Sequence, residues 1–117
     1  MNKFLSGFIY AFRGIAHGIK TGRNQKIHLA AAVFAVAAGI YTGLSDTGYC
    51  VLALTIAGVF SAELFNSAIE ALSDEVCGGA QKKSIEVIKD MSAGAVLIMA
   101  AASVVTAYFL FVKPLLD

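Results

Sequence analysis

Three long apolar stretches constrain this chain more than any other feature of its sequence. Residues 27–45 and 91–112 contain no Asp, Glu, Lys or Arg, and residues 49–72 contain only the acids Glu63 and Glu70. A helix of about 20 residues crosses the roughly 30 Å hydrocarbon core of a bilayer. Charged residues make up 15% of the chain, against about a quarter in soluble domains. We therefore expect an all-α membrane protein with three transmembrane helices.

The segment that precedes the first stretch, residues 3–20, is typical of an amphipathic helix. At 100° per residue its apolar side chains fall on one arc of about 140°, and basic and polar side chains occupy the rest. A phenylalanine-rich face opposite a basic face indicates a helix lying in the membrane interface. The apolar members are Phe4, Leu5, Phe8, Ile9, Phe12, Ile15, Ala16 and Ile19. The chain has no linker-like tract and no repeat, so residues 1–117 are predicted to form a single domain.

The distribution of basic residues predicts the topology. With an odd number of spans, the segment before the first span and the segment between the second and third lie on the same side. The positive-inside rule assigns that side, with the N-terminus, to the cytoplasm. The basic residues concerned are Lys3, Arg13, Lys20, Arg23 and Lys26 before the first span, and Lys82, Lys83 and Lys89 between the others.

The second span carries a polar stripe inside an otherwise apolar helix. A carboxylate at the centre of a spanning helix costs about 2.5–3.5 kcal/mol on insertion scales, which makes Glu63 a candidate functional residue. With Glu63 at 0°, the other polar side chains fall within a stripe about 100° wide on the same face. They are Asn66, Ser67, Glu70 and Asp74.

Further polar residues open the neighbouring spans on the same side. Lys89 and Asp90 precede the third span, and Asn24 and His28 open the first. A base for a hydroxyl proton, carboxylates for Mg²⁺ and a cation for a phosphoryl group are what phosphoryl transfer requires. The same stripe would also suit a polar seam between helices that fixes an oligomer. The spacing alone leaves both interpretations open.

Four segments resemble the small bacterial diacylglycerol kinase and undecaprenol kinase family. Residues 62–74, Ala-Glu-Leu-Phe-Asn-Ser-Ala-Ile-Glu-Ala-Leu-Ser-Asp, are similar to the family motif E-x-x-N-[ST]-A-I-E-x-x-x-D. Residues 88–98 are similar to a second motif around Lys-Asp, and residues 8–14 and 24–28 resemble F-x-x-A-x-x-G and N-x-x-I-H. The similarity extends over nearly the whole chain.

The resemblance implies a lipid kinase that uses ATP and Mg²⁺ at the cytoplasmic face of the bacterial inner membrane, working as a homotrimer with shared active sites. It implies that Glu63 is the general base and that Glu70 binds the metal. Asn66 and Lys89 would contact the phosphates, with Asp74 and Asp90 as further acids of the nucleotide site. Arg13, Asn24 and His28 would contact lipid or a subunit interface.

One departure from the family pattern concerns the metal site. Where the family usually has a glutamate that helps to bind metal, this chain has Gly22, within Thr21-Gly22-Arg23-Asn24. The alternative function is therefore a non-catalytic homologue that binds a lipid or a partner. The N-x-x-I-H element and the absence of tryptophan resemble the undecaprenol kinase branch of the family more than the diacylglycerol kinase branch, and this resemblance implies undecaprenol as the lipid.

Overall fold

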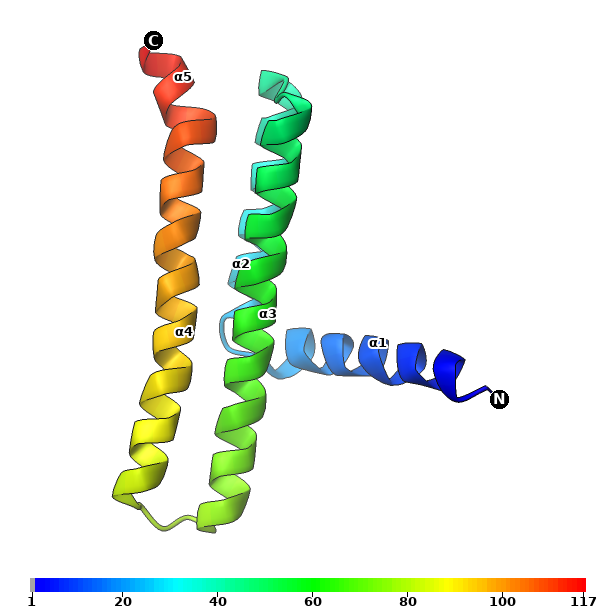
Figure 1. The fold of residues 1–117 in the computed structure, drawn as a ribbon, viewed down its shortest axis with the longest axis vertical. Helices are drawn as coiled ribbons and strands as arrows, with labels where there is room; N and C mark the ends of the chain where they lie inside the picture. The colour runs from blue at the N-terminus through cyan, green and yellow to red at the C-terminus, as the bar shows by residue number, and fades with distance from the viewer. Residues whose placement is uncertain (1) are drawn as a thin grey trace.

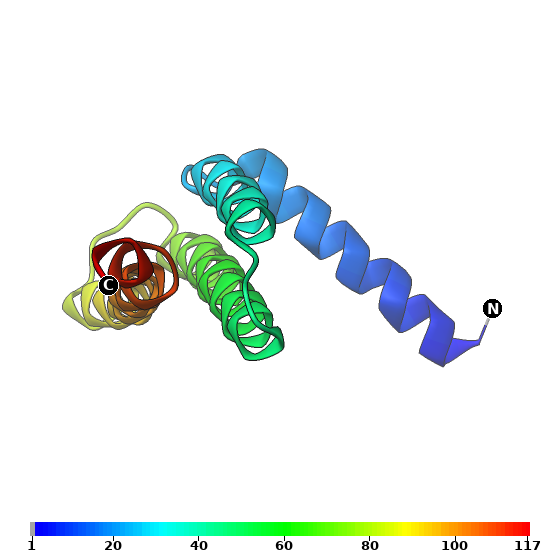
Figure 2. The same cartoon turned by 90° about the horizontal axis from the view of Figure 1, so that it is seen from above.

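The computed structural model describes residues 2–117, which form helices and no strand, as the sequence predicts. Three long helices stand side by side, and a fourth leaves the bundle sideways near its middle (Figure 1). Seen from above, α3 lies between α2 and α4, and α1 points away from all three (Figure 2). The elements are α1 (Lys3–Thr21), α2 (Gln25–Thr42), α3 (Asp46–Cys77), α4 (Lys83–Ala107), the π-helix η1 (Tyr108–Val112) and α5 (Lys113–Leu116).

The α1 helix contacts the bundle only near its C-terminal end. It begins where the Asn2 side chain accepts a hydrogen bond from the backbone N–H of Phe4 at 3.0 Å, which satisfies one of the free donors of the first turn. Its phenylalanines are exposed, and Gly18 packs on Leu64 of α3. The predicted amphipathic helix is confirmed as a separate arm, with an apolar face available to a membrane surface.

Among residues 2–117, three helices are long and apolar enough to cross a membrane. They are α2, α3 and the continuous helix Lys83–Leu116 formed by α4, η1 and α5. Most of their large apolar side chains point outward and are exposed. An apolar outer surface is what the bilayer requires of a spanning helix, because hydrocarbon cannot hydrogen-bond to polar groups.

α3 and α4 extend further than the apolar stretches, whereas α2 ends at Thr42. The sequence predicts a charged loop over residues 73–90, but most of this segment is helical. No helix-breaking residue follows Leu72 until Gly78, which ends α3 in the left-handed region at φ 55°, a conformation that glycine adopts without strain. α4 then begins at Lys83. At the other end, Ser45 caps α3, and the helix starts at Asp46 rather than Tyr49. Charged turns of helix therefore continue the spans beyond the apolar core.

Candidate functional site

Glu63, the first residue of the polar stripe on α3, contacts α2. Glu63 is only 4% exposed, and its Oε1 lies 2.9 Å from Nε2 of His28 on α2. A carboxylate accepts hydrogen bonds, so the Nε2–H of His28 is the donor in this pair. Because a buried carboxylate without a partner is strongly unfavourable, the His28 contact explains how Glu63 is held inside the bundle.

The next residue of the stripe, Asn66, contacts α4 instead. The hydroxyl of Ser92 donates to Oδ1 of Asn66 at 2.8 Å, and Ser92 is buried. With its oxygen occupied, the amide of Asn66 keeps its NH₂ donors for another acceptor. Sequence analysis did not select Ser92 as a site residue. Its spacing of three from Lys89 places both side chains on one face of α4 and could have revealed it.

At the end of the stripe, Asp74 pairs with Lys89. Nζ of Lys89 lies 3.0 Å from Oδ1 of Asp74, and both side chains are partly exposed. Lys89 precedes the uncharged part of α4, which starts at Met91. The hydrogen bond to Asp74 and the attraction of its charge raise the pKa of Lys89 above the ordinary 10.5. Lys89 is therefore fully protonated at neutral pH and is held beside α3.

The remaining predicted residues are not brought into these contacts. Within residues 2–117, no side-chain hydrogen bond or salt bridge involves Glu70, Asp90 or Asn24, and all three are exposed. The guanidinium of Arg13 lies on the free arm α1, 5.9 Å from the centre of the Tyr10 ring. Glu63, Asn66 and Asp74 thus join α3 to α2 and α4. The predicted residues Glu70, Asp90 and Asn24 are left facing outward.

The position of the missing acid is filled by another side chain. A Cβ atom placed on Gly22 would lie 2.5 Å from Cγ of Gln25 and 2.6 Å from the carbonyl oxygen of Gly18. Gln25 is completely buried, and neither Nε2 nor Oε1 has a hydrogen-bond partner in the described chain. Sequence analysis missed Gln25, although its spacing of three from His28 places both on the same face of α2.

Whether these side chains suit a magnesium ion depends on the further ligands that the ion brings with it, such as water and substrate phosphates. No cluster of three or more His, Cys, Asp or Glu side chains that could hold a metal occurs among the described residues. Mg²⁺ keeps several waters and often binds through one or two carboxylates together with substrate phosphates. Glu70, exposed on the stripe, suits an ion that arrives with a phosphate group. The part of the chain that the structure describes offers no closed cage for a free ion.

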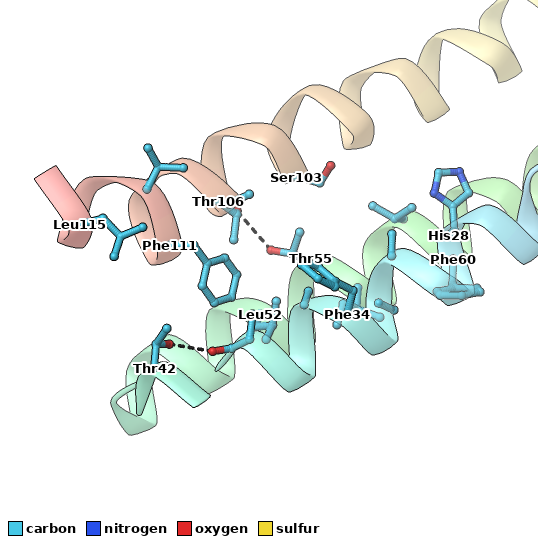
Figure 3. A pocket seen from close by; sticks show the side chains of 18 residues that line it. His28, Phe34, Thr42, Leu52, Thr55, Phe60, Ser103, Thr106, Phe111 and Leu115 are labelled. Carbon is cyan, nitrogen blue, oxygen red and sulfur yellow. Dashed lines mark hydrogen bonds between the residues drawn. The ribbon is translucent and has the colours of Figure 1, made fainter. Parts of the chain in front are cut away.

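An apolar cavity of about 560 Å³ runs beside α3 between α2 and the helix formed by α4 and η1. Figure 3 shows His28 at one end, Leu115 at the other, and Thr55 facing Thr106 between them. The Thr55 and Thr106 hydroxyls lie 3.3 Å apart. Among the described residues that line the cavity, His28 alone has an ionisable side chain, and it is also the partner of Glu63. The cavity therefore ends next to the buried acid.

These features define a multi-pass membrane protein with ionisable side chains held between its spans. The chain belongs to the prokaryotic diacylglycerol kinase family, whose sequence model matches residues 9–111. It is 36% identical over 113 residues to a diacylglycerol kinase of Synechocystis, covering 97% of this chain and 65% of that protein. It is 34% identical over 115 residues to an undecaprenol kinase of Bacillus subtilis, covering 98% of this chain and 93% of that protein.

Proposed function

We propose that this protein is an ATP-dependent lipid kinase that phosphorylates the hydroxyl of a membrane lipid at the cytoplasmic face of the bacterial inner membrane. The observation that carries the proposal is the buried carboxylate of Glu63 within a membrane-crossing helix, bonded to His28. Membership of a kinase family supports the same conclusion. An ionisable group at that depth is costly and indicates a functional role.

In this proposal Glu63 is the general base. Its Oε1 is held by His28, so Oε2 is the atom that accepts the proton of the lipid hydroxyl. The hydroxyl oxygen then forms a bond to the γ-phosphorus of ATP while the bond to the leaving β-phosphate oxygen breaks. A positioned base of this kind typically contributes 10²- to 10⁴-fold to a rate.

The polar residues nearer the helix ends would bind the nucleotide. Lys89, positioned by Asp74, supplies a positive charge to the phosphates, and the NH₂ group of Asn66 supplies donors. Glu70 would hold Mg²⁺, which neutralises charge on the phosphates, and Asp90 would assist at the nucleotide. Arg13 and Asn24, exposed on and next to α1, would contact lipid or a neighbouring subunit.

We further propose a homotrimer with active sites shared between subunits, and undecaprenol as the substrate. The exposed positions of Glu70 and Asp90 support a site that a neighbouring chain completes. The Bacillus subtilis undecaprenol kinase is matched over 93% of its length, but the Synechocystis diacylglycerol kinase over only 65% of its own. The N-x-x-I-H element at residues 24–28, which resembles the undecaprenol kinase branch, is what favours undecaprenol.

Glu63→Gln tests the proposed base. The variant keeps the size of the side chain but cannot accept the proton, so transfer of labelled γ-phosphate from Mg-ATP to undecaprenol in mixed micelles should fall by about 10²–10⁴-fold. Nucleotide binding should persist. Glu75→Gln, which changes an exposed acid on the same helix, is the matched control and should be unaffected. Normal turnover by Glu63→Gln would rule out this base.

The absence of an acid at Gly22 supports a second candidate, a homologue that binds lipid or a partner without catalysis. Thermal unfolding distinguishes the two, because a ligand that binds only the folded state raises stability by mass action. A kinase should be stabilised by Mg²⁺ with a non-hydrolysable ATP analogue. A non-catalytic homologue that has lost nucleotide binding should show no shift.

A further inference from the structure

The cavity beside α3 has the shape of a site for one long chain. Along α2 its lining residues run from His28 to Thr42, and 14 residues of helix correspond to about 21 Å. One leaflet contributes about 15 Å, half of the 30 Å hydrocarbon core. The cavity therefore reaches past the bilayer midplane. A chain that fills it must be longer than one leaflet is deep.

The chemistry of the lining suits a hydrocarbon. Its side chains are mostly alanine, phenylalanine and branched aliphatic residues, and its few hydroxyls include the Thr55–Thr106 pair, which lie close enough to hydrogen-bond to each other. The volume of about 560 Å³ falls in the usual range for small-molecule sites.

The position of the cavity relative to Glu63 sets the direction of the ligand. His28 lines the cavity and also donates to Glu63. A lipid with its hydrocarbon in the cavity would present its polar end at His28, next to the carboxylate. None of the described residues that line the opposite end, near Leu115 and Val112, is ionisable.

We propose that this cavity binds the part of a polyprenol-type lipid chain nearest the hydroxyl, in a single row from His28 towards Leu115, with the hydroxyl next to Glu63. The proposal rests on the lipid kinase function proposed above and adds the chain-binding site. It assigns to the cavity a preference for one long chain over the two shorter acyl chains of a diacylglycerol.

The test fills the far half of the cavity without changing the polar site. Ala38 lines the cavity, about 15 Å from His28 along α2 at 1.5 Å per residue, and Ala37 is an exposed neighbour outside the lining. Ala38→Phe and the control Ala37→Phe are compared on undecaprenol and on geraniol, a two-isoprene alcohol too short to reach residue 38. Initial rates of phosphate transfer give KM and kcat for each substrate.

Ala38→Phe should raise KM for undecaprenol by about tenfold or more, equivalent to about 1.4 kcal/mol, and should leave the kinetics with geraniol unchanged. Ala37→Phe should change neither. Equal KM values for undecaprenol in the two variants would overturn the proposal. The proposed kinase function would still stand if either alcohol were phosphorylated. A loss of activity by Ala38→Phe together with an altered oligomer mass would instead assign the cavity to a second copy of the chain.

A binding readout separates this proposal from catalysis. A polyprenol of four isoprene units, which matches the length of the cavity, with a diazirine at the end far from the hydroxyl should label peptides from the C-terminal end of α2 and from η1 and α5 that line the far part of the cavity. Excess undecaprenol should suppress the labelling. Labelling elsewhere would overturn the site even in an active enzyme. If neither alcohol is phosphorylated by the unaltered protein, the proposed function fails, and the inference fails with it.

Discussion

Gly22→Ala is expected to destabilise the corner between α1 and α2 even though the backbone there is ordinary. Gly22 has φ −70° and ψ 129°, which any residue adopts, so conformational freedom does not explain the glycine. The reason is space. The added Cβ would lie 2.5 Å from Cγ of Gln25 and 2.6 Å from the oxygen of Gly18, whereas ordinary contacts begin at 3.4 Å. Both neighbours would have to move by close to an ångström.

Neither neighbour can move freely. The oxygen of Gly18 accepts the hydrogen bond from the N–H of Gly22 at 2.8 Å, and Gln25 is completely buried. Overpacking of this kind typically costs about 1–3 kcal/mol. The reduced freedom of the unfolded chain offsets about 0.4–1 kcal/mol when alanine replaces glycine. The net loss for Gly22→Ala should therefore lie between about 0 and 2.6 kcal/mol, with a central value of about 1.3 kcal/mol.

Gly14→Ala is the matched control. Gly14 lies in the interior of α1, and a Cβ there would meet nothing within 4 Å, so the better helix propensity of alanine should stabilise by about 0.5–1 kcal/mol. The two variants thus change stability in opposite directions. Reversible unfolding in mixed micelles with increasing SDS, followed by circular dichroism, measures both. Equal or greater stability of Gly22→Ala would refute the steric argument.

The same geometry affects any attempt to restore an acid at this position. Gly22→Glu should carry the same steric cost, so a failure to gain activity would not show that the acid is unimportant. Gly22→Glu combined with Gln25→Ala removes one of the two contacts and should be more stable than Gly22→Glu alone. Unfolding curves of the two variants check this order.

Three further predictions concern the polar contacts of α3. His28→Gln, which keeps an N–H donor for the buried carboxylate, should retain more of kcat than His28→Ala, with KM for ATP unchanged in both; equal kcat values would show that the donor has no role. Ser92→Ala should reduce stability by about 0.5–1.5 kcal/mol by removing the donor to Asn66, measured by SDS unfolding; no loss would contradict the 2.8 Å bond. Asp74→Asn should lower the pKa of Lys89 towards 10.5, which the NMR shift of its ¹³Cε reports. Because the folded pKa is raised, the stabilisation from this pair is complete below pH 10.5 and is lost as the pH rises through the folded pKa.

The sequence predicted the class of fold because apolar length and charge distribution act locally along the chain. The spans, the amphipathic arm and the stripe of Glu63, Asn66 and Asp74 all follow from periodicity within single helices. The helix ends were less predictable. Charged residues form helices outside the hydrocarbon as readily as loops, so the sequence did not reveal that α3 continues to Cys77 and that α4 starts at Lys83.

Only the tertiary structure decided which side chains meet across helices. The sequence placed His28 and Lys89 near the stripe, but the rotation of each helix about its axis assigned His28 to Glu63, Ser92 to Asn66 and Lys89 to Asp74.

The occupation of the space at Gly22 by the Gln25 side chain, and the cavity that ends at His28, likewise depend on the angles between α1, α2 and α4. Those angles come from packing between residues far apart in the chain, and no local pattern records them.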